Sequence, residues 1–157
     1  MIHESVFEVK NNVEGVLKIA DGKVKVLDAE TLRGSLIDTL VRDAVFGSDD
    51  VKALAQWLIW EAGQALGVRP ASIHEFYIAR ASNAWEGRTV PAMNIRFASY
   101  DTGRAAFRAA QKTNTGAFIF EIARSEMGYT EQPPAEFTTV LLAAGIKEGF
   151  EGPIFIQ

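Results

Sequence analysis

Three polar side chains stand at or near the ends of apolar segments in the second half of the chain. Asn94 lies near the end of residues 89–95, Glu121 lies near the end of residues 116–122, and Gln157 ends the segment 152–157. In parallel α/β proteins, function collects where strands end and loops begin. We therefore expect these amide and carboxylate groups to line a polar binding site.

Glu121 is the strongest of these candidates, because its carboxylate stands in the apolar run GAFIFEI. Burying a charge is costly unless it is paired or binds a cation. Two interpretations stay open: an ion pair with Arg96 or Arg124, or a place in a polar site. The residues that follow, 123–130, carry both signs of charge and a glycine, which is typical of an active-site loop and equally of an ordinary solvated loop.

Composition and charge exclude several kinds of site and partner. The chain has 157 residues, no cysteine, only two histidines, His3 and His74, and a formal net charge of -4. A thiolate or multi-histidine metal site within this chain is therefore excluded, and general binding to nucleic acid or anionic membranes has no electrostatic support. The charged start does not resemble a signal peptide, and no apolar run approaches membrane-spanning length, so we expect a cytoplasmic protein.

The first half of the chain predicts a mostly helical region, residues 1–86, that contains one hairpin. Asp21-Gly22 at the centre of residues 16–27 suits a two-residue turn between strands. Ser72-x-x-Glu75 has the form of a capping box that opens the last helix. The expected helices cover residues 4–11, a segment from 28 or 31 to about 46, 49–66 and 72–81.

The second half, residues 87–157, alternates apolar runs with helical patterns at about thirty residues per unit. Strands are expected at residues 89–95, 116–122 and 152–157, and helices at 101–112 and after Pro133 and Pro134. This arithmetic predicts parallel strands in the order of the chain. The last strand has no following helix, which fits either the edge of a small three-stranded sheet or, as we favour, the truncation of a larger βα protein.

These strand motifs resemble the class II, metal-dependent aldolases, a family that includes fructose-bisphosphate and tagatose-bisphosphate aldolases. Pro91-Ala92-Met93-Asn94 is similar to the family's first-strand PAFN or PAVN, and residues 117–122 are similar to its second strand. The family's third strand leads into an Asp-His pair, which is expected directly after Gln157. The resemblance covers residues 89–157.

The resemblance implies an α/β fold in which residues 87–157 form the first three strands of a (β/α)8 TIM barrel, preceded by an added helical region. It implies reversible aldol cleavage of a ketose bisphosphate and a divalent metal, usually zinc, in the full-length protein only. The substrate-binding residues carried over are Asn94, Glu121 and Ser125, with no catalytic residue and no metal ligand in this chain. The family serine aligns with Ala123, two residues before Ser125, so phosphate contact there is in doubt.

Our leading hypothesis is the N-terminal part of a metal-dependent aldolase-like protein, inactive as this chain alone, whose partner is a phosphorylated sugar. Two alternatives stay open: a non-catalytic aldolase-like barrel subunit, and a free-standing α/β interaction module. Self-association into a homo-oligomer is also left open, and the sugar is not identified.

Overall fold

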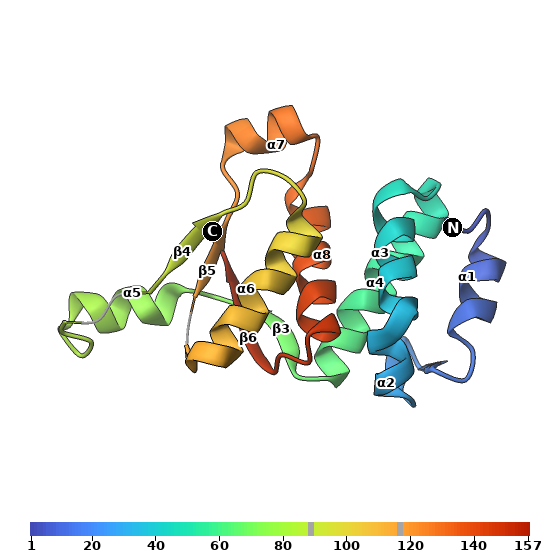
Figure 1. Cartoon of the computed structure of the whole chain (residues 1–157), viewed down its shortest axis with the longest axis horizontal. Helices are drawn as coiled ribbons and strands as arrows, with labels where there is room; N and C mark the ends of the chain where they lie inside the picture. The colour runs from blue at the N-terminus through green and yellow to red at the C-terminus, as the bar shows by residue number, and fades with distance from the viewer. Residues whose placement is uncertain (88–89, 116–117) are drawn as a thin grey trace.

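The computed structural model describes residues 1–87, 90–115 and 118–157. The molecule is elongated, with a parallel sheet toward one end and helices with a small hairpin toward the other (Figure 1). The expectation of an α/β fold with a parallel sheet and a separate hairpin is confirmed. Residues 88–89 and 116–117 lie outside the described residues, and with them the first residue of the predicted strand 89–95 and the first two of the predicted strand 116–122.

The N-terminal elements begin and end where short polar signals predict. Helix α1 (Val6–Val13) begins after Ser5, whose Oγ accepts a hydrogen bond from the backbone N–H of Glu8. Strands β1 (Leu17–Ala20) and β2 (Lys23–Val26) form an antiparallel hairpin. The turn residues Asp21 and Gly22 have φ values of 52° and 69°, the left-handed geometry that such a turn requires.

The helix expected from residue 28 or 31 to about 46 is present but interrupted. Asp28 caps α2 (Ala29–Thr31) by accepting from the Thr31 backbone N–H at 2.9 Å. The wide turn η1 (Leu32–Leu36) follows, where Gly34 has a ψ of -130° outside helical geometry. Helix α3 (Ile37–Phe46) then ends at Gly47, and α4 (Asp49–Ala65) ends before Gly67, as predicted.

Helix α8 (Pro134–Lys147) is the centre of the hydrophobic core. It is buried along most of its length and packs against α3, α4 and α6 (Ser99–Thr113). Such an all-round apolar helix is typical of a core position. One contact is polar: the Trp60 indole N–H of α4 donates to Thr139 Oγ1 at 3.0 Å.

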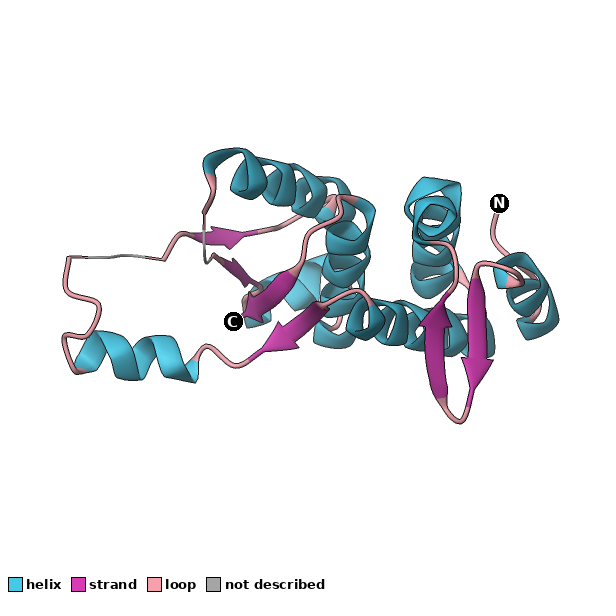
Figure 2. Ribbon diagram, turned by 90° about the horizontal axis from the view of Figure 1, so that it is seen from below, coloured by secondary structure: helices cyan, strands magenta, loops and turns pink. Residues whose placement is uncertain are grey.

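The sheet has four strands in the order β3 (Val68–Ala71), β6 (Gly152–Ile156), β5 (Ile119–Glu121) and β4 (Ala92–Asn94), all parallel. The predicted order of the last three strands is confirmed. Helices α6 and α8 cover one face of the sheet (Figure 2), where Phe107 of α6 contacts Phe118 and Phe120. Gly103, Phe107 and Ala110 belong to the buried face of α6, which packs against the core.

Strand β3 is the main difference from the sequence expectation of three strands. It belongs to the predicted helical region 1–86, yet it pairs with β6 and places β6 inside the sheet, so the edge-strand interpretation of residues 152–157 is wrong. The Gly152 N–H donates to the Gly67 carbonyl at 2.9 Å, which starts this pairing. Pro70 lacks an N–H and weakens a strand signal, but an edge strand tolerates it.

Two further segments differ in detail from the predictions. Residues expected as a polar loop form helix α7 (Arg124–Thr130). Helix α5 (His74–Ala81) is present, but the predicted capping box is not formed, because Ser72 Oγ accepts from the His74 N–H at 3.2 Å instead of from Glu75. Neither difference changes the order of the sheet.

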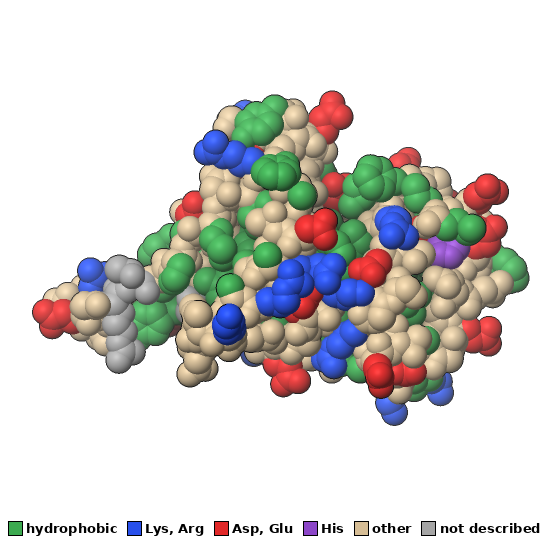
Figure 3. Space-filling view, viewed as in Figure 1, with side chains coloured by type: hydrophobic (Ala, Val, Ile, Leu, Met, Phe, Trp, Pro, Cys, Tyr) green, Lys and Arg blue, Asp and Glu red, His purple; other side chains and the backbone are tan. Residues whose placement is uncertain are grey.

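Ion pairs join α3 to the helices that cover the sheet. Lys147 Nζ lies 2.8 Å from Asp38 Oδ2, and the Tyr100 hydroxyl donates to Asp38 Oδ1 at 2.7 Å. Beside them Glu148 pairs with Arg104 at 2.6 Å and with Arg108 at 2.8 Å. Basic side chains gather over α6 with acidic ones between them (Figure 3). Among the described residues, no helix has the length and apolar character needed to cross a membrane.

Candidate functional site

Asn94, Glu121 and Gln157 come together at the carboxyl ends of three neighbouring strands. Asn94 of β4 is aligned with Glu121 of β5, and the N–H of Ile122 donates to the Gln157 carbonyl at 2.9 Å. The backbone pairing therefore places the three residues in one row across the sheet. These residues are far apart in the sequence, and the register of the parallel strands brings them together.

Alternation along β5 decides which way the Glu121 side chain points. Phe120 is fully buried against Phe107 on the face that α6 and α8 cover. Successive side chains of a strand point to opposite faces, so Glu121 shares the other face with Ile119. That face bears α5, whose Phe76 ring lies 4.6 Å from the Phe155 ring, measured between centroids.

An apolar cavity of about 250 Å³ lies between this face and α5. Its lining includes Ile119 and Tyr77, and the Tyr77 hydroxyl donates to Gln157 Oε1 at 2.9 Å. The remaining lining residues are Ile73, Phe76, Arg80, Trp85 and Val90. Sequence reasoning missed Tyr77, because an aromatic residue on a helix carries no signal that distinguishes binding from packing.

Arg96, one of the two arginines expected to pair with Glu121, pairs with a different carboxylate. Arg96 Nε lies 3.1 Å from Glu126 Oε1, and Glu126 is 3% exposed. In the described part of the chain, neither Arg96 nor Arg124 pairs with Glu121, which is half-buried. Glu126 Oε2 also accepts from the Ala123 N–H at 2.7 Å, so this residue anchors the start of α7.

Ser125 is not brought into the row of strand-end residues by any described contact. It is exposed in the first turn of α7, and Ala123 at the preceding cap position has no hydroxyl group. The loop after β5 therefore offers a bound group less hydroxyl chemistry than the family pattern implies. Asn94 is exposed and Glu121 half-exposed at the strand ends, where both can bind a polar ligand.

The described residues do not fit a zinc site. No group of three metal-ligating side chains occurs among them. His3 Nδ1 lies 2.6 Å from Asp43 Oδ2 in the helical region, whereas His74 is exposed on α5. A catalytic zinc requires three protein ligands around one point, which the described residues do not bring together.

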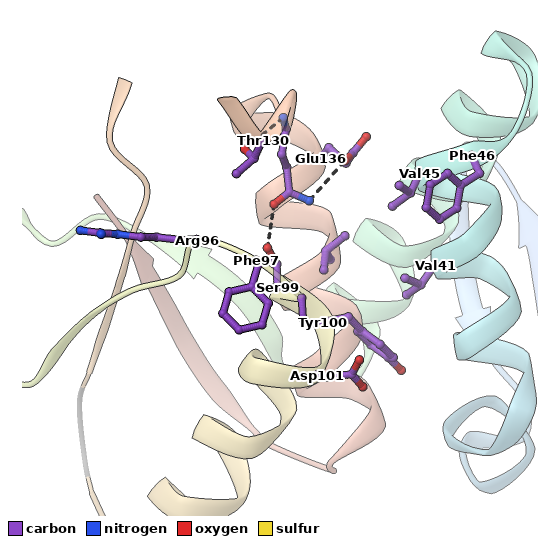
Figure 4. A pocket seen from close by; sticks show the side chains of 13 residues that line it. Val41, Val45, Phe46, Arg96, Phe97, Ser99, Tyr100, Asp101, Thr130 and Glu136 are labelled. Atoms are coloured by element: carbon purple, nitrogen blue, oxygen red, sulfur yellow. Dashed lines mark hydrogen bonds between the residues drawn. The ribbon is translucent and has the colours of Figure 1, made fainter. Parts of the chain in front are cut away.

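A second and larger cavity, of about 590 Å³, lies between α3 and the loop that follows β4 (Figure 4). Ser99 Oγ donates to Gln132 Oε1 at 2.7 Å, and Gln132 Nε2 donates to Glu136 Oε1 at 3.2 Å. No local pattern in the sequence indicates this network, because its members belong to three separate segments: α6, the α7–α8 connection and α8.

No protein-family model, curated protein or solved structure matches this chain.

Proposed function

We propose that residues 89–157 form the opening strands of a class II aldolase-like (β/α)8 barrel, and that the complete protein catalyses reversible aldol cleavage of a ketose bisphosphate. The observation that supports this proposal is the register of β4, β5 and β6. Three consecutive parallel strands carry Asn94, Glu121 and Gln157 to one edge, where barrels build their active sites.

In this proposal the chain contributes substrate contacts and not the reacting groups. The Asn94 amide donates a hydrogen bond to a substrate oxygen, and the Glu121 carboxylate accepts one from a sugar hydroxyl. Ser125, exposed in the first turn of α7, contacts the phosphorylated end of the substrate. Zinc and the proton-transfer group belong to residues outside this chain, so the chain alone is inactive. A cytoplasmic location, which suits a sugar phosphate substrate and a chain without cysteine, is part of the proposal.

Strand β3 favours a second candidate function, an α/β interaction module without catalysis. In a barrel the strand that follows β6 would pair with its outer edge, but β3 holds that edge in this chain. A barrel therefore requires β3 and α5 to leave the sheet. If β3 stays in place, β6 cannot pair with a further strand of a barrel. The site at the strand ends then remains next to α5.

The decisive experiment compares the 157-residue chain with the product of the complete reading frame that contains it. Cleavage of fructose 1,6-bisphosphate and tagatose 1,6-bisphosphate is measured with zinc and with EDTA. We expect cleavage only by the complete product with zinc, and an at least tenfold lower kcat/KM for Asn94→Ala. The matched control is Asn12→Ala, an exposed asparagine of α1, which should leave turnover unchanged. A reading frame that stops at Gln157, or a complete product without aldolase activity, would reject the proposal.

A cysteine pair separates the two candidate functions. Residues 1–157 contain no cysteine, so Arg69→Cys and Pro153→Cys introduce the only thiols of this segment, at aligned positions of β3 and β6, and any cysteine elsewhere in the complete product is first replaced by serine. Cross-linking with a short bis-maleimide in the complete product would show that β3 keeps its place, which supports the interaction module. No cross-link in the complete product, with an efficient one in the 157-residue chain, supports the barrel.

A further inference from the structure

We propose that the larger cavity, between α3 and the loop that follows β4, binds a small organic ammonium ion that carries an apolar body. This inference does not depend on the aldolase proposal, because the cavity shares no residue with the row formed by Asn94, Glu121 and Gln157. Its volume of about 590 Å³ lies within the range of small-molecule sites.

The walls of the cavity suit an apolar body. Val41, Val45 and Phe46 of α3 form one side (Figure 4), and Val140 of α8 also lines the cavity. Two aromatic side chains at the rim are left largely in water: Phe46 is 70% exposed and Phe97 is 80% exposed. Covering such rings with a ligand removes apolar surface from water, which is favourable.

A buried carboxylate supplies the charge that selects a cation. Glu136 is 8% exposed and extends from α8 toward α3 (Figure 4). Its Oε1 accepts from an uncharged amide, that of Gln132, and no Lys, Arg or His of the described residues forms an ion pair with it. Its Oε2 accepts no hydrogen bond from them and is not sealed from solvent. That oxygen is open to an N–H donor of a ligand.

The other charged groups of the lining do not favour an anion. Asp101 adds a second carboxylate at the start of α6, which lies 3.8 Å from the Arg104 guanidinium, and Arg96 is the one cationic side chain among the lining residues. Arg96 points away from α3 and donates to Glu126 (Figure 4). The helix dipoles of α6 and α8 attract negative charge, but Asp101 and Glu136 already occupy their first turns.

Aromatic faces add to the preference for a cation. Phe46 and Phe97 line the cavity, as does Tyr100, but the Arg104 guanidinium already lies 5.5 Å from the centroid of the Tyr100 ring, so the two phenylalanines are the rings available to a ligand. A cation over an aromatic face is attracted by the ring quadrupole. Apolar walls, aromatic rings and one buried carboxylate together match an amine on a hydrophobic skeleton better than a sugar phosphate or a neutral alcohol.

The test uses three probes of one shape and different charge: 2-phenylethylamine, 2-phenylethanol and 3-phenylpropionate. Binding to the 157-residue chain is followed by amide chemical shifts in NMR titrations. We expect the amine to bind at least tenfold more tightly than the alcohol and the propionate to bind most weakly, with shifts at Phe97, Ser99 and Gln132. Equal binding of amine and alcohol, or shifts away from the cavity, would overturn the proposal.

Glu136→Gln tests the carboxylate directly, because it keeps the shape of the side chain and removes the charge. The advantage of the amine over the alcohol should disappear in this variant. In the control, Glu131→Gln, an exposed glutamate of the α7–α8 connection that does not line the cavity, the advantage should remain. An unchanged preference in Glu136→Gln rejects the proposal. If that variant does not fold, the ranking of the three probes on the unaltered chain decides.

Discussion

Asn94 and Glu121 are aligned residues of two adjacent parallel strands, although 26 residues separate them in the chain. Their side chains share the face of the sheet that α6 and α8 leave uncovered. This relationship depends on backbone register and not on a contact between the two side chains. A substitution at either position is therefore expected to act on ligand binding more than on folding.

Glu121→Gln is expected to change the free energy of unfolding by less than about 0.5 kcal/mol, since Glu121 is half-exposed and forms no ion pair among the described residues. In the complete protein the same change should lower kcat/KM for a ketose bisphosphate at least tenfold, equivalent to about 1.4 kcal/mol. Thermal unfolding and steady-state kinetics measure the two effects. Unchanged turnover together with a large loss of stability would show that Glu121 has a structural role.

Tyr100→Phe is expected to destabilise the protein by about 1.5–3 kcal/mol, the usual range for a hydrogen bond to a charged group. Its hydroxyl donates to Asp38 Oδ1 at 2.7 Å and links α6 to α3. Burial, with the hydrogen bond to Asp38, raises the pKa of Tyr100, so the phenol stays protonated near neutral pH. Denaturant unfolding measures the loss; Tyr129→Phe, on an exposed tyrosine of α7, is the control and should cost little.

The stability of the protein should fall in acid partly through Asp38. Burial acts to raise the pKa of Asp38, but hydrogen bonds from Lys147 and Tyr100 outweigh it and hold the pKa below its usual value. The unfolded chain, with an Asp pKa of about 3.9, therefore binds this proton first as pH falls. The contribution of Asp38 is complete above about pH 5 and is lost as pH falls through the lower, folded pKa.

Urea unfolding at a series of pH values, for the unaltered chain and for Asp38→Asn, checks this expectation. The difference in unfolding free energy between the two proteins should be largest above about pH 5 and should shrink in stronger acid. A difference that stays constant with pH would show that the Asp38 carboxylate does not contribute through its charge. Asp50→Asn, on an exposed aspartate of α4, provides the control.

Gly63→Ala is expected to destabilise the protein by about 1–3 kcal/mol through overpacking. A Cβ atom at Gly63 of α4 would lie 2.7 Å from the backbone carbonyl oxygen of Val68, which cannot move without disturbing β3. Gly128→Ala in α7 is the control, because a Cβ atom there meets nothing within 4 Å. If both variants unfold at the same temperature as the unaltered chain, the close approach of α4 to β3 is absent in solution.

The sequence by itself determined the features that depend on neighbouring residues. Asp21-Gly22 defines the hairpin turn, because only a few residue types accept positive φ at both central positions. Gly47 and Gly67 mark the ends of α3 and α4, and the apolar run around Phe120 marks a strand covered by helices. The parallel order of β4, β5 and β6 followed from the spacing of strands and helices, and with it the alignment of Asn94 with Glu121.

Tertiary structure alone decided the features that depend on distant residues. Strand β3 has little strand signal of its own and exists as a strand because β6, more than eighty residues later, offers it an edge. The pairing of Arg96 with Glu126 and the contact of Tyr77 with Gln157 likewise join segments that no local pattern connects. Local propensity depends on a few adjacent residues, whereas cavities, ion pairs and sheet edges form only when packing brings separate segments together.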